Sequence, residues 1–237
     1  YTCTCGQLCE CCTFWWYLAF TYATCRNRHS LGRLRLAEQH HMRQFLLFVF
    51  TLLIPFFALW TIASTPIALP AVGIVSNLLS NWFPDVVNAL YFSGPEAILT
   101  TEFGESSGQL IPLSQSDYRL GFEINTRILS YSLPFYTALH FATEKKTYLA
   151  DYLWGVLILY ALFIFGLMCL CLKTLMVNVG APFFNQPGVF VPNAEVIAIT
   201  YQFSALIVPT LAPAVLWMWQ SKDSQLLRGV FVKTVDS

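Results

Sequence analysis

The sequence predicts an all-α polytopic membrane protein with about four transmembrane helices and a small extracytoplasmic β segment. Of the 237 residues, 56% are hydrophobic and 11% are charged, whereas soluble domains usually carry about 25% charged residues. Several apolar runs are long enough to cross the roughly 30 Å hydrocarbon core of a bilayer as helices. A polar and acidic stretch, residues 91–127, contains the strict alternation that is typical of a strand.

The charge balance and the absence of known motifs exclude several classes of function. The formal net charge is zero, so the chain has no basic field that would attract nucleic acid. The sequence contains no G-x-x-x-x-G-K-[ST], no G-x-G-x-x-G and no H-E-x-x-H, so nucleotide-driven transport and zinc-protease chemistry have no sequence support. We therefore expect no cofactor and no metal, and we expect the lipid bilayer to be the environment of the chain.

The first forty-one residues differ in composition from the rest. Six of the eight cysteines lie before the first methionine, Met42, and these are Cys3, Cys5, Cys9, Cys11, Cys12 and Cys25. We interpret residues 1–41 as a non-native or upstream-translated extension, with a natural start at Met42. A metal or redox site is the alternative, because closely spaced thiolates bind zinc, although the spacing gives no pair of C-x-x-C knuckles.

The first half of the remaining chain contains one predicted span and the β segment. Residues 42–65 form the first predicted transmembrane helix, in which Pro55 is expected to cause a kink rather than a break. Residues 66–90 are interrupted by prolines, glycine and asparagines, which favours a separate interfacial or re-entrant helix. Within residues 91–127, the alternation from Tyr118 to Asn125 predicts a strand, and residues 97–103 are a candidate partner strand.

The second half contains three more predicted spans. They are residues 128–143, which are short and contain Pro134, residues 152–177, which are almost unbroken Leu, Ile, Val and Phe, and residues 196–219. Residues 178–195 are predicted as an extracytoplasmic loop, and residues 220–237 as a cytoplasmic tail. Basic residues precede the first span, separate the second from the third and follow the fourth, so the positive-inside rule places both termini in the cytoplasm.

Few residues in the spans are candidates for chemistry. His140 is ionisable and lies in a predicted span, which makes it a functional candidate by default, although packing near the inner interface is the simpler interpretation. Cys169 and Cys171 are alternative nucleophiles only if a base and a positive environment lower their pKa, and buried inert cysteines are commoner. Tyr201 and Gln202 place polar groups in the last span, where hydrogen bonds between helices are the preferred interpretation.

Several phrases together resemble the exosortase H-associated membrane proteins of Gram-negative bacteria, from Met42 to about the end of the last span. They are Phe57-Ala58-Leu59-Trp60, Asn125 with Tyr131, Leu133-Pro134-Phe135 and Ala138-Leu139, and the run from Ile197 to Trp217. Pro209 and Pro213 lie in that last run. On this resemblance Asn125, Arg127, Pro134, Pro209 and Pro213 are candidate helix-contact or functional polar residues.

The resemblance implies a supporting role in the bacterial inner membrane, beside an exosortase-type membrane transpeptidase that processes proteins with a C-terminal sorting tail. It implies no activity of its own. Exosortases use a cysteine, an arginine and a histidine, but Arg127, His140 and Cys169 occur here in the opposite order. The chain is therefore predicted to be a non-enzymatic accessory protein; an intramembrane thiol peptidase or a transporter subunit is the alternative.

Overall fold

The computed structural model describes residues 34–106, 109–143 and 148–222. By internal contacts the chain divides into Tyr1–His41 and Met42–Ser237. All the helices and strands described belong to the second unit, apart from the first residues of helix α2. The cysteine-rich stretch that is predicted to be foreign, or to bind metal, lies outside the described residues up to position 33. The predicted cytoplasmic tail lies outside them from position 223.

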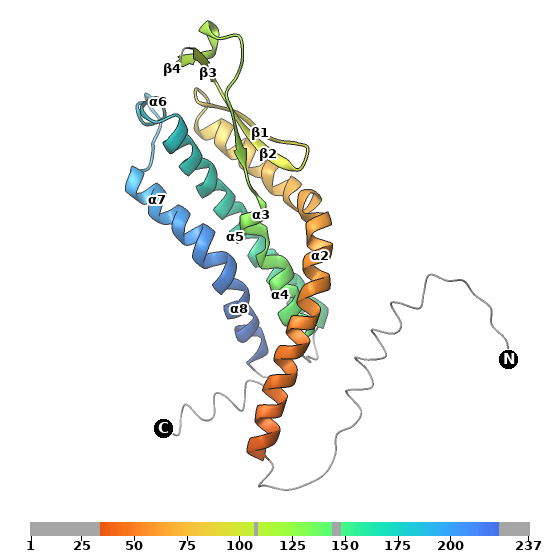
Figure 1. The fold of residues 1–237 in the computed structure, drawn as a ribbon. Coiled ribbons are helices and arrows are strands. Elements are labelled where there is room, and N and C mark those ends of the chain that lie inside the picture. The colour runs from red at the N-terminus through yellow and green to blue at the C-terminus, as the bar shows by residue number, and fades with distance from the viewer. Residues whose placement is uncertain (1–33, 107–108, 144–147, 223–237) are drawn as a thin grey trace, which may run out of the picture. The chain divides into compact units, whose positions relative to one another are not determined.

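Long apolar helices dominate the second unit (Figure 1). They are α2 (Leu34–Trp82), α5 (Tyr148–Asn178) and a continuous last helix made of α7 (Ala194–Gln202), the π-helical segment η2 (Phe203–Ile207) and α8 (Val208–Ser221). Among the described residues, three helices are long and apolar enough to cross a membrane: Arg43–Trp82, Leu149–Asn178 and Ala194–Ser221. The prediction of a mostly helical chain with several apolar helices and a small sheet is thus confirmed.

The region of the second predicted span, residues 128–143, forms two short helices. Helix α3 covers Arg127–Ser130 and α4 covers Ser132–Phe141. The ten residues of α4 extend about 15 Å, roughly half of the hydrocarbon core. A fourth span therefore stays a prediction. The loop after α5 contains one further short helix, α6 (Ala181–Phe184).

The β segment contains two small antiparallel sheets. The first has the strand order β1 (Val87–Ser93), β2 (Glu96–Thr101) and β5 (Gly121–Ile124), with Leu99 opposite both Leu90 and Phe122. The second is a hairpin of β3 (Phe103–Ser106) and β4 (Gln109–Pro112), followed by the 3-10 turn η1 (Leu113–Gln115). Figure 1 shows the three-stranded sheet alongside the C-terminal half of α2.

The structure differs from the expected elements in three places. Helix α2 continues through Pro66 and Pro70, because a missing backbone donor is tolerated in a long helix whose neighbours support it. It ends at Trp82, just before Pro84, and the last residues of the stretch predicted as interfacial helix form β1 instead. The candidate partner strand at residues 97–103 is divided between β2, which ends at Thr101, and β3, which begins at Phe103.

The buried side chains form two clusters. The larger one joins the C-terminal half of α2, the three-stranded sheet and the C-terminal half of α5; it includes Val75, Leu79, Phe83, Leu99, Ile124, Phe163, Leu167 and Leu175. The smaller one joins α4, α5 and α8 around Leu133, Tyr136, Leu159 and Leu216. The sheet is therefore held by helices α2 and α5, since so small a sheet would be marginal alone.

Candidate functional site

A buried polar cluster joins α4, α5 and α8 around Tyr136, and we call it the Tyr136 cluster. The Tyr136 hydroxyl donates to Gln220 Oε1 at 2.6 Å and lies 3.2 Å from the Asp151 carbonyl oxygen. Gln220 Nε2 donates to the same Asp151 carbonyl at 2.9 Å. Three helices are thus tied together by hydrogen bonds between groups that would be costly to bury alone.

The Tyr136 cluster forms because Gly155 of α5 leaves room for it. A Cβ atom on Gly155 would collide with the Tyr136 hydroxyl and ring. On the other side, the Tyr136 ring stacks on Tyr152 with centroids 6.0 Å apart. The tyrosine is completely buried, at 0% exposure, so its position is fixed by both neighbours.

His140 belongs to this cluster. It is fully buried, its Nδ1 lies 3.4 Å from the Tyr136 hydroxyl, and its ring centroid is 5.4 Å from that of Tyr152. One turn further, Trp217 Nε1 donates to the Thr143 hydroxyl at 2.7 Å. The tyrosines beside His140 also form hydrogen bonds with other side chains, Tyr136 with Gln220 and Tyr152 with Thr137. These contacts favour the packing interpretation of His140, which stays a prediction.

The two candidate nucleophiles lie far from His140. Cys169 and Cys171 are buried side chains of α5. Cys169 comes seventeen residues after Tyr152, the residue that contacts His140, which corresponds to about 25 Å along a helix. A thiol and its base must lie within hydrogen-bond reach, so the structure does not bring this pair together.

The last helix changes its hydrogen-bonding pattern in the middle. Pro209 has no N–H to donate toward the Ala205 carbonyl, and the π-helical turn Phe203–Ile207 immediately precedes α8. Pro209 and Pro213 are both buried against the bundle, as Pro134 is in α4. A small cavity beside this turn is lined by residues from α3, α4, α5, η2 and α8, among them Ser132, Ser204 and Pro209.

Tyr201 and Gln202 end the first part of this helix and do not share a role. The Lys173 ammonium of α5 lies 5.5 Å from the Tyr201 ring centroid, which is a cation–π distance. Gln202 is exposed. Of these two residues, Tyr201 therefore contacts a neighbouring helix in the described structure, and Gln202 has an exposed side chain.

Asn125 and Arg127 lie where the chain passes from β5 into α3. Asn125 Oδ1 accepts a hydrogen bond from the Arg127 backbone N–H at 3.1 Å, a local turn that asparagine commonly forms. Both side chains are exposed. The asparagine thus directs the strand into the helix, and the exposed arginine is not among the buried groups of the Tyr136 cluster.

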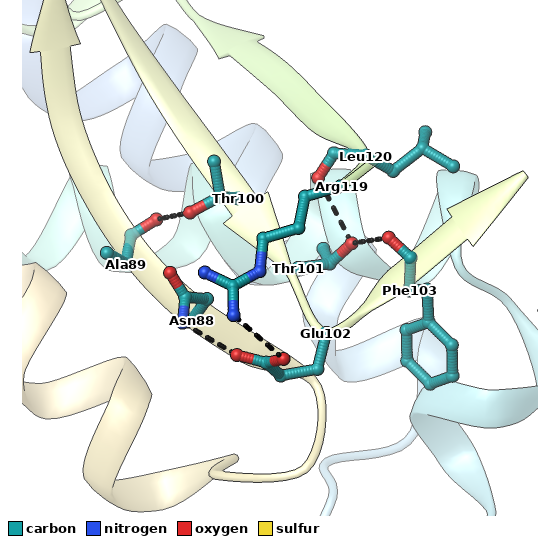
Figure 2. A network of polar contacts seen from close by, with 8 residues as sticks. All are labelled: Asn88, Ala89, Thr100, Thr101, Glu102, Phe103, Arg119 and Leu120. Carbon is teal, nitrogen blue, oxygen red and sulfur yellow. Dashed lines mark hydrogen bonds and ion pairs between the residues drawn. The ribbon is translucent and has the colours of Figure 1, made fainter. Parts of the chain in front are cut away.

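A second polar cluster, which the sequence patterns do not indicate, lies at the junction of the two sheets (Figure 2). The carboxylate of Glu102 accepts from Asn88 Nδ2 at 2.6 Å and pairs with Arg119 at 3.4 Å. The Thr101 hydroxyl donates to the Leu120 carbonyl oxygen at 3.2 Å. Glu102 therefore joins β1 to the segment that returns to β5, and its only sequence signal is an acidic residue between two β-rich stretches.

No metal centre is found in residues 34–106, 109–143 and 148–222, since these contain no group of three or more His, Cys, Asp or Glu side chains that could hold an ion. Comparison with known proteins identifies a family. The family model described as exosortase H-associated membrane protein matches residues 39–224. No curated protein and no solved structure matches the chain.

Proposed function

The chain belongs to the exosortase H-associated membrane protein family, and from this premise we propose that it is a non-enzymatic accessory subunit of an exosortase-type membrane transpeptidase. In this role it supports the processing of C-terminal sorting signals and the sorting of proteins to the envelope of Gram-negative bacteria. The observation that carries the proposal is the extent of the family match. It includes all three long apolar helices, apart from the first residues of α2, and both sheets.

The interior of the molecule is consistent with a structural role. Within the described residues, the buried polar groups of the Tyr136 cluster bond to one another and to backbone carbonyls. Catalytic groups, in contrast, converge on a space that a substrate can enter. The cavity beside the π-helical turn is small and lined mostly by apolar side chains, so it offers little to a peptide substrate.

For the arrangement in the membrane, we infer four spans in the inner membrane with both termini in the cytoplasm. The Arg43–Trp82 part of α2 has 40 residues, about 60 Å, or twice the hydrocarbon core. The sheet packs on the end of α2 that is far from Arg43, and open sheet edges do not occur in hydrocarbon. With the basic residues in the cytoplasm, the sheet faces the extracytoplasmic side, and α3 with α4 forms the short second span.

The direct test of the proposed function is co-purification from the native host. The chain is expressed from Met42 with an affinity tag, solubilised in mild detergent, and its partners are identified by mass spectrometry. We expect an exosortase in stoichiometric amount, and none with an unrelated tagged polytopic membrane protein from the same host. A stable protein recovered alone, under conditions that preserve other membrane complexes, contradicts the proposal.

The alternative of a thiol peptidase makes a different prediction for Cys169 and Cys171. Both cysteines are buried, so replacing them together with alanine removes two small side chains from the core and is expected to leave sorting-signal processing within about twofold of wild type. Loss of a true nucleophile lowers turnover by a factor on the order of a thousand or more. Processing of a reporter with a sorting tail, at matched protein levels, distinguishes the two outcomes.

A further inference from the structure

Helix α5 and the last helix are longer than a bilayer is thick. The apolar part of α5, Leu149–Asn178, has 30 residues, and the last helix, Ala194–Ser221, has 28, which correspond to about 45 and 42 Å. The hydrocarbon core is about 30 Å thick, and the average tilt of about 20° lengthens the path through it only slightly. Each helix therefore has about 10 Å or more to place outside the hydrocarbon.

The sheet decides at which end of α5 this extra length lies. Strand β5 is an edge of the three-stranded sheet, and it contacts α5. Its last residue, Ile124, is buried in the cluster that includes Leu167 and Leu175 of α5. Open sheet edges do not occur in hydrocarbon. The C-terminal part of α5 therefore lies outside the bilayer core, together with the sheet.

Three segments meet at one level beside the end of β5, which we call the Gly166 level. A Cβ on Gly166 of α5 would lie 3.1 Å from Leu129 Cδ2 of α3 and 3.7 Å from the Ser204 carbonyl oxygen of the last helix. From this level to their other ends, at Leu149 and Ser221, α5 and the last helix each extend about 27 Å. This length is close to the hydrocarbon thickness of about 30 Å. The Gly166 level thus marks the boundary of the hydrocarbon on the side of the sheet.

Arg127 lies at this boundary. It comes two residues before Leu129 and three residues after Ile124, the end of β5, and its side chain is exposed. Within the described ranges the one ion pair joins Arg119 to Glu102, so Arg127 has no acidic partner in that part of the chain. The planar, permanently charged guanidinium matches the oxygens of a phosphate in a bidentate contact.

A second cation agrees with this placement of the bilayer. Lys173 lies seven residues beyond Gly166 on α5, about 10 Å outside the boundary, and its ammonium lies 5.5 Å from the Tyr201 ring centroid. If α5 were centred in the bilayer, Lys173 would lie at the edge of the hydrocarbon, where a charged group is costly. The Gly166 level keeps this charge outside the hydrocarbon.

We propose that Arg127 binds the phosphate of a phospholipid in the headgroup layer on the sheet side of the membrane. The headgroups begin where the hydrocarbon ends, which is the level at which the structure holds this guanidinium. The contact fixes the depth of the bundle, so that the sheet stands clear of the bilayer. It depends on α5 and the last helix crossing the membrane and on no partner protein, so failure of the co-purification leaves it unaffected.

The depth of the last helix provides the first test. A fluorescent amino acid is incorporated genetically at Ile199 or Trp219, which lie near opposite ends of this helix and are 67% and 63% exposed. The full chain is placed in vesicles of phosphatidylethanolamine and phosphatidylglycerol, and Leu211, 57% exposed, serves as the control for the bilayer centre. We expect lipids with brominated tails to quench position 219 about threefold or more as strongly as position 199, which lies about 7 Å outside the Gly166 level. Equal quenching at the two ends, or stronger quenching at position 199, overturns the proposed depth.

Solid-state NMR provides the second test, because it measures the contact itself. Arginine is labelled with 13C at Cζ, and the buffer contains no phosphate, so that phospholipid is the only source of 31P. We expect the signal that Arg127→Gln removes to be dipolar-coupled to phosphorus, and the signal that the control Arg119→Gln removes to be uncoupled, since Arg119 pairs with Glu102 in the sheet region. An uncoupled Arg127 signal, from a guanidinium in water or paired with a second copy of the chain, overturns the proposal.

Discussion

Replacing Gly155 by alanine is expected to destabilise the protein by about 2–4 kcal/mol, because the added methyl group enters space that Tyr136 occupies and displaces its hydroxyl from Gln220 and Asp151. A Cβ at this position would collide with the hydroxyl and ring of Tyr136, and the ring cannot retreat because it stacks on Tyr152. Thermal unfolding in detergent, followed by circular dichroism, measures the loss.

Two further variants separate the possible causes of that loss. Gly73→Ala changes an exposed helix glycine, where an added Cβ would meet nothing within 4 Å. This substitution is expected to be neutral or stabilising by up to about 1 kcal/mol. Tyr136→Phe removes the hydroxyl and should make Gly155→Ala less costly in the double variant than in isolation, since the two side chains are in contact. Equal destabilisation by Gly73→Ala and Gly155→Ala would contradict this explanation.

The apolar runs predict the long helices because membrane helices are selected by hydropathy over about twenty residues. The same criterion misplaces the boundary at Pro66, since the continuation of α2 to Trp82 depends on support from the sheet and α5, which is tertiary information. Strand β5 and its partner β2 follow from alternation. Strand β1 was not predicted. Val87 and Leu90, three residues apart, are both buried, and a short apolar run does not distinguish a strand from a helix.

The candidate site was partly predictable. His140 stands out as an ionisable residue among apolar ones, and Tyr136 precedes it by four residues, on the same face of a helix. Gln220 is 84 positions from Tyr136, and the distance to it depends on how α4 packs against α8. Gly73 is a comparable case: it looks like a helix breaker in sequence, and only the space beside it in the structure shows that it is exposed rather than packed.

Phe83→Ala is expected to be the most destabilising truncation in the sheet region, at about 3–5 kcal/mol. The side chain is completely buried, and its ring centroid lies 4.9 Å from that of Trp82 and 5.2 Å from that of Phe183. Its carbonyl accepts from the N–H groups of Val86 and Val87 at 3.1 and 2.9 Å. The truncation therefore leaves a cavity where α2, β1 and α6 meet, and both thermal unfolding and proteolysis of the sheet should report it.

Leu78→Ala removes a comparable apolar side chain five residues earlier in the chain, near the end of α2, where Leu78 is 48% exposed. Its effect on unfolding is expected to stay within about 0.5 kcal/mol, as for other surface substitutions. The pair therefore tests whether burial, rather than position near the end of α2, decides the loss, because Phe83 is completely buried and Leu78 is half exposed. A Leu78→Ala variant as unstable as Phe83→Ala would contradict this explanation.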